Sequence, residues 1–310
     1  MIGVVGCGLW GRNVVRTFYE LKALSAVWDQ EPDCCGKLAH QYNVEACPWD
    51  KILSDPKIRG VAICVPADGH AVLIEQALKA GKHVFVEKPT TLCLQQARSL
   101  VSLAKEKQLV LMTGHILHYH PAYCALQEHL HKVGDIQLID TIRCGWGRVS
   151  VKERNVIWNL LVHDVSAVLG LPGCQEVVSV QAQGGGILTS ADWVCVQLRF
   201  ASKVIARLQA SWVLPTKQQR MTILGKEGTF VLDDCAQEGK ELLFQPQSVY
   251  AMTVPEAAEY FISYETISPL YKECQVFMNH VLNGTTVKTN GTEALRTLSI
   301  LEDIESNLTH

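Results

Sequence analysis

Two short stretches carry side chains that can exchange a proton with a bound substrate. HVFVEKPTT (83–91) ends an apolar run with Glu87 and Lys88 before a proline, and LLVHD (160–164) carries His163 in a helical pattern. Oxidation of a secondary alcohol requires that hydride leaves the carbon and that a base takes the hydroxyl proton. An amine whose pKa is lowered by partial burial can take that proton, and so can an imidazole poised near neutrality. Which of Lys88 and His163 is the final acceptor stays open, because the two can titrate together.

A glycine-rich string, GCGLWG at residues 6–11, matches the G-x-G-x-x-G pattern of a dinucleotide-binding turn. An apolar strand precedes the string and a helix begins at Gly11, which is the context that the pattern requires. Gly6 permits the tight turn, Gly8 lets the backbone approach a pyrophosphate, and Gly11 lets the helix pack closely on the strand. The helix N-terminus then offers N–H groups and a positive dipole to the phosphates. A glycine turn without a dinucleotide is the alternative.

Asp29 ends the next strand and is expected to accept hydrogen bonds from the adenosine ribose hydroxyls. Gln30 and Glu31 follow it rather than an arginine, so a 2′-phosphate would meet acid, and NAD is favoured over NADP. Pro66 is expected to border the same crevice, whereas His70 is favoured as the start of a helix. The residues assigned to the cofactor site are Gly6, Gly8, Leu9, Trp10, Gly11, Asp29, Pro66, His70, Glu87 and Lys88.

The composition argues against several classes of protein. The chain has 310 residues, 48% hydrophobic and 19% charged, which is typical of a globular protein with room for two domains. A net charge of −3 gives no reason to expect nucleic acid or an anionic membrane as partner. No apolar run is long enough to span a membrane, and no signal peptide is expected. Twelve cysteines without a C-x-x-C pair indicate free thiols, and hence a cytoplasmic location.

Short strands alternate with helices in the first third of the chain, which predicts a parallel sheet covered on both faces. The expected strands are 2–6, 25–29, 60–66, 83–88 and 109–115, and the expected helices are 11–23, 33–42, 49–54, 70–81 and 94–108. These elements predict a doubly wound, Rossmann-type domain at residues 1–118.

The rest of the chain predicts a second, mostly antiparallel sheet. The expected strands are 136–145, 177–184, 192–200, 203–213, 220–225 and 228–233, with helices at 121–134 and 158–171 and two more divided at Asn283-Gly284. One strand places alternate apolar residues on one face, namely Val194, Val196, Leu198 and Phe200. Residues 119–310 are therefore expected to form an α+β domain with a large open sheet, one face on a core and the other on solvent or a partner.

Several motifs in chain order resemble one family of oxidoreductases. They are the N-terminal GxGxxG, VPADGH (65–70), VEKP (86–89), TGHILHYHPA (113–122) and the HD pair at 163–164. Together they resemble the glucose–fructose oxidoreductase, inositol dehydrogenase and rhizopine-catabolism (Gfo/Idh/MocA) family over nearly the whole chain. Three stretches, GLWGRNVVRTFYELKAL, HYHPA and ERNVIWNLLVHDVS, are most similar to members that resemble UDP-N-acetyl-sugar 3-dehydrogenases.

The resemblance implies a Rossmann domain followed by a domain whose open sheet lines the substrate site on one face and often packs against another subunit on the other. A homo-dimer or homo-tetramer is therefore expected. The family's lysine falls on Lys88 and its histidine on His163. The aspartate that the family commonly carries four residues before the histidine is Asn159 here, so a carboxylate proton relay is not available at that position.

Polar residues near these positions are candidates for holding a polar or phosphorylated substrate, Arg148 by bidentate contact. The predicted substrate-binding residues are Tyr119, His120, Arg148, Asn155, Asn159, His163 and Asp164. Packing is an equal alternative for Tyr119 and His120, and a solvated loop is the alternative for Arg148 and Asn155. Five histidines between 115 and 131 lack the spacing of a ligand set, so no metal site is predicted.

The sequence therefore predicts an NAD-dependent oxidoreductase that acts on a secondary alcohol of a sugar or nucleotide sugar, with C3 of a UDP-N-acetyl-sugar as the specific candidate. A catalytically silent NAD- or sugar-binding protein is the first alternative, indicated by Asn159 and by the apolar LLV before His163. A dehydrogenase of a non-sugar cyclic polyol or an imine is the second.

Overall fold

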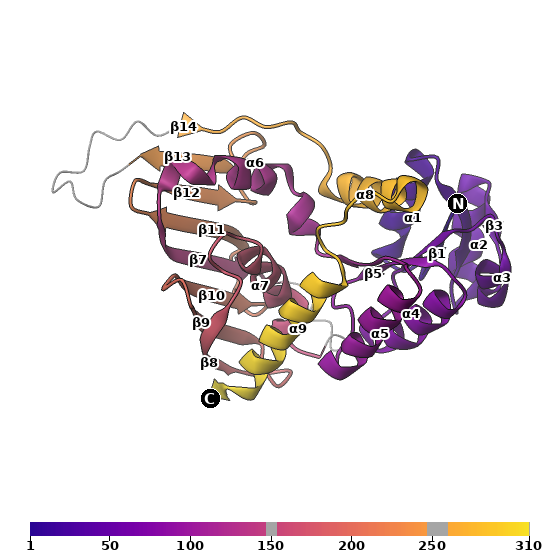
Figure 1. Ribbon diagram of the computed structural model, residues 1–310, viewed down its shortest axis with the longest axis horizontal. Helices are drawn as coiled ribbons and strands as arrows, with labels where there is room; N and C mark the ends of the chain where they lie inside the picture. The colour runs from indigo at the N-terminus through magenta and orange to yellow at the C-terminus, as the bar shows by residue number, and fades with distance from the viewer. Residues whose placement is uncertain (147–153, 247–259, 310) are drawn as a thin grey trace. The chain divides into compact units, whose positions relative to one another are not determined.

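The computed structural model describes residues 1–146, 154–246 and 260–309 (Figure 1). These residues divide into two compact units. The first contains Met1–Ile116 and Ser268–Leu298, and the second contains Leu117–Ile267 and Ser299–His310. The sequence prediction assigned 268–298 to the second domain, whereas these residues pack within the first unit.

The first unit contains a six-stranded sheet in the order β3-β2-β1-β4-β5-β6, and all neighbouring strands are parallel. The strands are β1 Ile2–Val5, β2 Leu24–Trp28, β3 Glu45–Ala46, β4 Gly60–Ile63, β5 His83–Glu87 and β6 Leu111–Gly114. The strand order reverses between β1 and β4. In a doubly wound sheet, ligands bind at the carboxyl ends of the strands beside this reversal.

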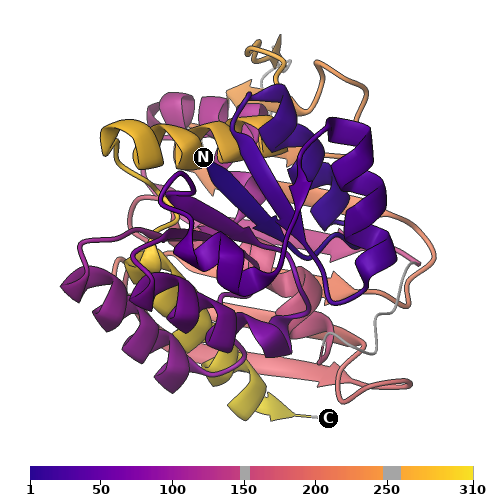
Figure 2. The same cartoon turned by 90° about the vertical axis from the view of Figure 1, so that its right-hand side faces the viewer.

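Helices cover both faces of this sheet, as predicted (Figure 2). They are α1 Gly11–Glu20, α2 Pro32–Tyr42, α3 Trp49–Ser54, α4 His70–Lys79, α5 Leu94–Glu106 and α8 Pro269–Asn283. On one face, α8 packs beside α1, and Phe277 meets Phe18 and Phe85 with ring centroids 6.3 and 5.9 Å apart. That contact explains why α8 belongs to this unit despite its late place in the chain.

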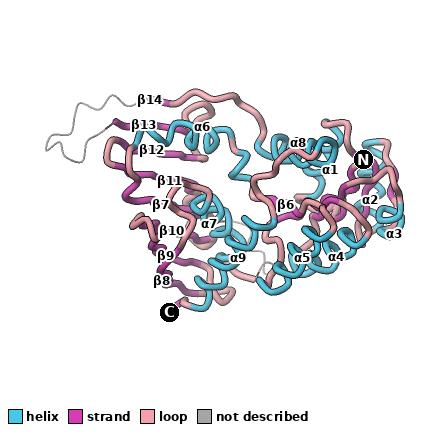
Figure 3. Tube along the Cα trace, viewed as in Figure 1, coloured by secondary structure: helices cyan, strands magenta, loops and turns pink. Residues whose placement is uncertain are grey.

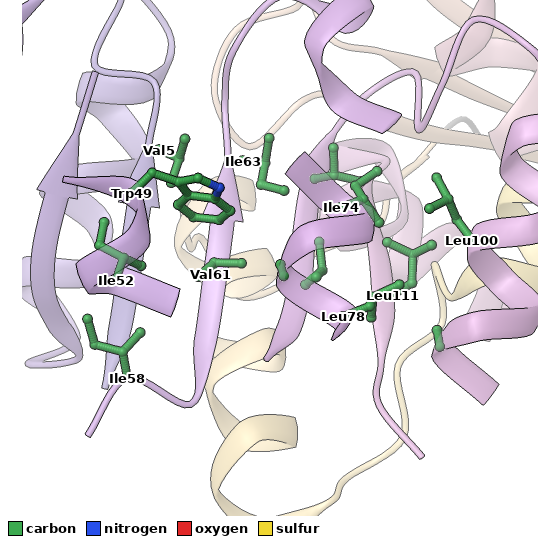
Figure 4. Packing of buried hydrophobic residues seen from close by; sticks show 14 of the residues in the cluster. Val5, Trp49, Ile52, Ile58, Val61, Ile63, Ile74, Leu78, Leu100 and Leu111 are labelled. Atoms are coloured by element: carbon green, nitrogen blue, oxygen red, sulfur yellow. The ribbon is translucent and has the colours of Figure 1, made fainter. Parts of the chain in front are cut away.

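The core on the other face comes from α3, α4 and α5 against the central strands (Figure 4). Trp49 and Ile52 of α3 and Ile74 of α4 are buried against Val61 and Ile63 of β4. β4 is therefore apolar on both faces, as a central parallel strand must be. This core fixes the strand ends at which the chemistry-bearing residues emerge.

The second unit contains a nine-stranded sheet in the order β14-β13-β12-β11-β7-β10-β9-β8-β15 (Figure 3). The strands are β7 Ile136–Cys144, β8 Val177–Gly185, β9 Trp193–Phe200, β10 Ile205–Ser211, β11 Gln218–Gly225, β12 Gly228–Asp233, β13 Leu242–Pro246, β14 Tyr260–Phe261 and β15 Leu308–Thr309. Most neighbouring pairs are antiparallel, as predicted, but β7–β10 and β8–β15 are parallel. The parallel pairs were not anticipated, because strand order cannot be deduced from alternation alone.

Helices α6 Pro121–His129 and α7 Val162–Leu169 lie on one face of this sheet, and α9 Gly291–Ser306 ends in this unit. The predicted alternation in β9 is confirmed, since Val194, Val196, Leu198 and Phe200 are buried. On the opposite face, Arg207 and Asp140 pair across neighbouring strands at 2.9 Å, and both are exposed. The sheet therefore has one face on the core and one open face.

Two helices predicted from periodicity differ in detail from the structure. The segment predicted at 158–171 is a π-helical turn, Ile157–Leu161, followed by α7. The segment predicted at 121–134 is α6 followed by a 3₁₀ turn, Leu130–Val133. A π turn inserts one residue into the helical repeat and is found frequently at functional sites.

Within the described ranges, no helix has the length and apolar character needed to cross a membrane.

Candidate cofactor and active site

The glycine turn between β1 and α1 has the backbone geometry that the motif predicts. Gly6 has a φ of +93°, and a Cβ there would lie 2.6 Å from the backbone carbonyl carbon of Cys64. A Cβ on Gly11 would lie 1.8 Å from the Gly6 carbonyl oxygen. A Cβ on Gly8 would meet no heavy atom within 4 Å, so a bulky group can approach the backbone there. The first turn of α1 carries no acidic side chain and no side-chain cap, which suits a phosphate.

Asp29 lies beside this turn and is anchored by two backbone amides. Its Oδ2 accepts a hydrogen bond from the Cys7 amide at 2.5 Å, and its Oδ1 accepts one from the Glu31 amide at 2.9 Å. Each carboxylate oxygen keeps acceptor capacity for a ribose hydroxyl. Burial, reinforced by the Asp29 charge, raises the pKa of the Cys7 thiol to about 12, so the thiol stays neutral beside the carboxylate. The turn and Asp29 together fit the pyrophosphate and adenosine ribose of NAD.

Lys88 follows β5 directly, at the same edge of the sheet, and is half-buried. The Lys88–Pro89 peptide bond is cis. On the β6 side, the hydroxyls of Thr90 and Thr113 lie 2.6 Å apart in a buried hydrogen bond. The turn that carries Lys88 is thus fixed to the neighbouring strand.

On the β4 side, the same turn is held by His70, which is 1% exposed and begins α4 as predicted. Its Nδ1 lies 2.8 Å from the Pro89 carbonyl oxygen and its Nε2 lies 2.9 Å from that of Val65. Burial lowers the pKa of His70 below its ordinary value, while these carbonyls oppose the shift. A neutral imidazole has one N–H, so it donates to one of the two carbonyls at a time. His70 therefore links the loop that carries Val65 to the loop that carries Pro89. Its contact with the cofactor stays a prediction.

His115, at the end of β6, is a neighbour of Lys88 that the sequence did not single out for this role. Its Nε2 lies 3.5 Å from the Glu293 carboxylate. Burial, with a further contribution from the Lys88 charge, lowers the pKa of His115 to about 3, so the ring is neutral at physiological pH. His115 directly follows β6, and Lys88 directly follows the neighbouring parallel strand β5. These positions in the sequence could have indicated that His115 and Lys88 lie close together.

Trp10 and Glu87 join the glycine turn to the end of β5. The Trp10 indole N–H donates to Glu87 Oε1 at 2.5 Å. Since β4 lies between β1 and β5, this hydrogen bond crosses the position where strand order reverses. The structure thus brings Gly6, Gly8, Trp10, Gly11, Asp29, Glu87 and Lys88 to one edge of one sheet, as the sequence predicted, with Leu9 64% exposed in the turn.

In the second unit, His163 lies in the first turn of α7 and is half-buried. Asn159, four residues earlier, is half-buried in the π turn. Asp164, by contrast, is 2% exposed and faces the sheet. Arg143 Nε donates to Asp164 Oδ2 at 2.7 Å and Arg143 Nη2 donates to Oδ1 at 3.1 Å.

This ion pair was not foreseen. Burial raises the pKa of Asp164, and the Arg143 guanidinium, which stays charged, opposes that shift through both hydrogen bonds. The bidentate geometry favours the ionised pair. The signal was present in β7, where Arg143 follows Ile139 and Thr141 on the face that points to the core. An arginine at such a position requires a buried acid.

Tyr119 and His120 lie ahead of α6, as predicted. Tyr119 is 4% exposed, and His120 Nε2 lies 3.1 Å from Asp234 Oδ1. Burial alone would raise the pKa of Asp234, but His120, Arg143 and Lys217 lower it overall. Asp234 was missed by the sequence analysis because it sits in a polar turn after β12 with no motif around it.

Asn155 is 1% exposed and its polar atoms are used within the unit. Its Nδ2 donates to Ser190 Oγ at 3.1 Å and to Glu305 Oε1 at 2.8 Å, and its Oδ1 accepts from the Ile157 amide. In the structure, Asn155 lies at the start of the helical segment before α7, and its contact with substrate stays a prediction. Arg148, the other residue of this segment predicted to bind substrate, lies outside the described residues.

Among the described residues, no group of three or more potential ligands is arranged to hold a metal ion.

Comparison with known proteins agrees with this geometry. Residues 1–115 match the family model described as an oxidoreductase family with an NAD-binding Rossmann fold, and residues 132–231 match the GFO/IDH/MocA C-terminal domain. The fold and the first-unit site thus define an NAD-binding oxidoreductase. The chain is 30% identical over 227 residues to UDP-N-acetylglucosamine 3-dehydrogenase of Acidithiobacillus ferrooxidans, over 73% of this chain and 71% of that protein. It belongs to the Gfo/Idh/MocA family.

Two further similarities extend over more of the chain. Inositol 2-dehydrogenase of Rhizobium meliloti is 24% identical over 293 residues, which is 90% of this chain and 87% of that enzyme. The solved structure of the Acidithiobacillus ferrooxidans enzyme, named GnnA, superimposes with a TM-score of 0.89 at 25% identity, covering 99% of this chain and 97% of that one. The family resemblance seen in the motifs is confirmed.

The charge of Asp29 is expected to set the choice between NAD and NADP. Replacing Asp29 by asparagine should weaken NAD binding and reduce the preference for NAD over NADP by about tenfold or more, because a charge effect of roughly 1.4 kcal/mol corresponds to that factor. Binding isotherms for both nucleotides measure the ratio. Asp50→Asn, an exposed acid in the first turn of α3, is the matched control and should leave the ratio unchanged. If the ratio of NAD to NADP affinity is unchanged in Asp29→Asn, the carboxylate stabilises the turn but does not select the nucleotide.

Proposed function

We propose that this oxidoreductase oxidises a ring secondary alcohol of a sugar or nucleotide sugar with NAD, and that C3 of a UDP-N-acetylhexosamine is the first substrate to test. The observation that carries the proposal is the position of Lys88, which emerges at the carboxyl end of β5 on the edge that the glycine turn and Asp29 define. The nucleotide-sugar class is supported by the 30% identity with UDP-N-acetylglucosamine 3-dehydrogenase.

Each residue has a definite task in this proposal. NAD, when bound, supplies a hydride acceptor. Lys88 holds the substrate hydroxyl and either takes its proton or shares that task with His163. His115 is kept neutral by burial, so it adds no positive charge beside the lysine. Asn159 can hold a hydroxyl by hydrogen bonding but cannot take a proton, so the base must be one of the other two groups.

The test is to incubate the purified protein with NAD and a panel of UDP-N-acetylglucosamine, UDP-N-acetylgalactosamine, UDP-glucose, free N-acetylglucosamine and inositol. Nicotinamide absorbance and mass spectrometry of the sugar follow the reaction. Since cofactor can remain bound and recycle, substrates deuterated at the candidate carbon are included, and loss of deuterium reports reversible hydride transfer. Reaction of inositol in preference to every nucleotide sugar would overturn the substrate class.

The second candidate function is that of a silent NAD- and sugar-binding protein, and Asn159 favours it. In that case the protein binds both ligands in calorimetry, but no deuterium leaves the substrate carbon. Turnover or exchange with any member of the panel excludes this candidate.

We further propose that the open face of the nine-stranded sheet is a contact between subunits. Trp193 is 38% exposed there, alternating with the buried Val194. Sedimentation at two or more times the subunit mass of 34.3 kDa supports a homo-oligomer, and a monomer contradicts it.

All twelve cysteines are free thiols, which supports a location in the reducing cytoplasm.

A further inference from the structure

Glu273 is a buried carboxyl group for which the proposed reaction has no use. It lies in the second turn of α8 and is 1% exposed. Its Oε1 has no hydrogen-bond partner among the described residues. A buried polar atom without a hydrogen-bond partner destabilises the fold, so its presence requires an explanation.

The packing of α8 places Glu273 beside the end of β5. Phe277, one turn later on the same face of the helix, contacts Phe85. Phe85 and Glu87 point to the same side of β5, and a Cβ built on Gly114 would lie 3.2 Å from both Phe85 Cζ and Glu87 Oε2. Glu273 lies one turn before Phe277 on the face of α8 that packs toward β5, and the carboxyl groups of Glu273 and Glu87 interact electrostatically.

The groups around the two acids include Lys88, which follows Glu87 directly in the chain, and two thiols. Burial, and then the Glu87 charge, raise the pKa of Glu273 well above its ordinary value. From the end of β4 and from α8, the thiols of Cys64 and Cys274 face the same region, and burial raises the pKa of both, so they are uncharged. Trp10 donates its neutral indole N–H to Glu87 at 2.5 Å, which favours the ionised form of Glu87. Together these effects favour the protonated form of Glu273 and the ionised form of Glu87.

We propose that Glu87 and Glu273 form a carboxyl pair that holds one proton, and that the pair gives up this proton when the cationic, oxidised nicotinamide ring binds at the adjoining strand edge. The inference rests on the proposed NAD-dependent function. The physical reason is that a positive charge close to the pair stabilises a second carboxylate, whereas the neutral, reduced ring does not. The pair would therefore carry two negative charges when the oxidised cofactor is bound and one when the reduced cofactor is bound.

The consequence is a difference in proton release between the two forms of the cofactor. Binding of the oxidised form should release up to one more proton than binding of the reduced form. By linkage, the ratio of the affinities for oxidised and reduced cofactor should rise with pH, with a limiting slope of about tenfold per pH unit. Below the pH range in which the pair titrates, the ratio should be constant.

Titration calorimetry of both nucleotides, in two buffers of different ionisation enthalpy, measures the number of protons released. The wild-type protein should show the difference, and Glu273→Gln, which preserves the shape and removes the titratable group, should abolish it. Phe277→Leu is the matched control, because it disturbs the same packing without changing a charge, and it should keep the difference. Equal proton release for the two nucleotides in the wild-type protein would overturn the proposal, as would an undiminished difference in Glu273→Gln.

A second readout needs no cofactor. A carboxyl group whose pKa is raised by folding contributes stability below its unfolded pKa, and this contribution is lost as the pH rises through the folded pKa. The Tm of the wild-type protein should therefore fall relative to that of Glu273→Gln as the pH rises above the ordinary range of glutamate. If neither nucleotide binds, the proposed function fails and the ligand-linked part of the inference fails with it. A Tm difference independent of pH overturns the shared proton itself.

Discussion

Replacing Lys88 by alanine is expected to lower turnover of the sugar substrate by at least about a hundredfold, whereas the loss of NAD affinity from its predicted contact with the cofactor should be much smaller. Positioned proton transfer by a side chain contributes typically 10²–10⁴-fold to a rate, and the variant removes both the donor that holds the hydroxyl and one candidate for the base. The turn itself should persist, because His70 and the Thr90–Thr113 hydrogen bond hold its backbone rather than the lysine side chain.

Steady-state rates measured across a range of pH, together with an NAD isotherm, check this expectation. Lys79→Ala is a suitable control, since Lys79 lies exposed on α4 in a pair with Glu75 and should not affect the rate. The companion variant His163→Ala separates the two candidate bases. If His163 is the final acceptor, the acid limb of the pH profile disappears in that variant and persists in Lys88→Ala at a low rate. Unchanged turnover in Lys88→Ala would remove the lysine from the mechanism.

Much of the first unit could be predicted because its signals are local. Strand, turn, helix and acid occur in fixed order around GCGLWG, where Gly6 is required by its positive φ and Gly11 by a clash with the Gly6 carbonyl oxygen. Parallel strands of one sheet end at one edge, so once the strands were located, Asp29 and Lys88 had to emerge there together.

The parts that could not be predicted depend on contacts between distant segments. Glu273 lies 186 positions after Glu87, and nothing in the pattern of α8 shows that this helix returns to the first sheet. The pairing of Arg143 with Asp164 similarly joins a strand to a helix across the core of the second unit. Burial is also hard to foresee for single polar side chains. Asn155 and His70 are buried and hydrogen-bonded to protein groups, and their contacts with a ligand stay predictions.

Replacing Asp164 by asparagine is expected to lower the free energy of unfolding by about 3–5 kcal/mol, because the buried Arg143 guanidinium would remain charged without a carboxylate opposite it. Thermal and urea unfolding at neutral pH measure the change. Asp140→Asn breaks the exposed pair with Arg207 and should cost no more than about 1 kcal/mol. A comparable small loss in Asp164→Asn would mean that the guanidinium finds other acceptors.

The double variant Arg143→Met with Asp164→Leu tests what the pair contributes beyond stability. Removing both charges together avoids an unpaired buried ion, so most of the lost stability should return. His163 precedes Asp164 in α7, and a bidentate pair fixes the orientation of that turn in a way that apolar packing does not. We therefore expect the double variant to be stable and still slow, with the loss in kcat rather than in KM. Full activity in a stable double variant would show that the ion pair stabilises the fold without positioning His163.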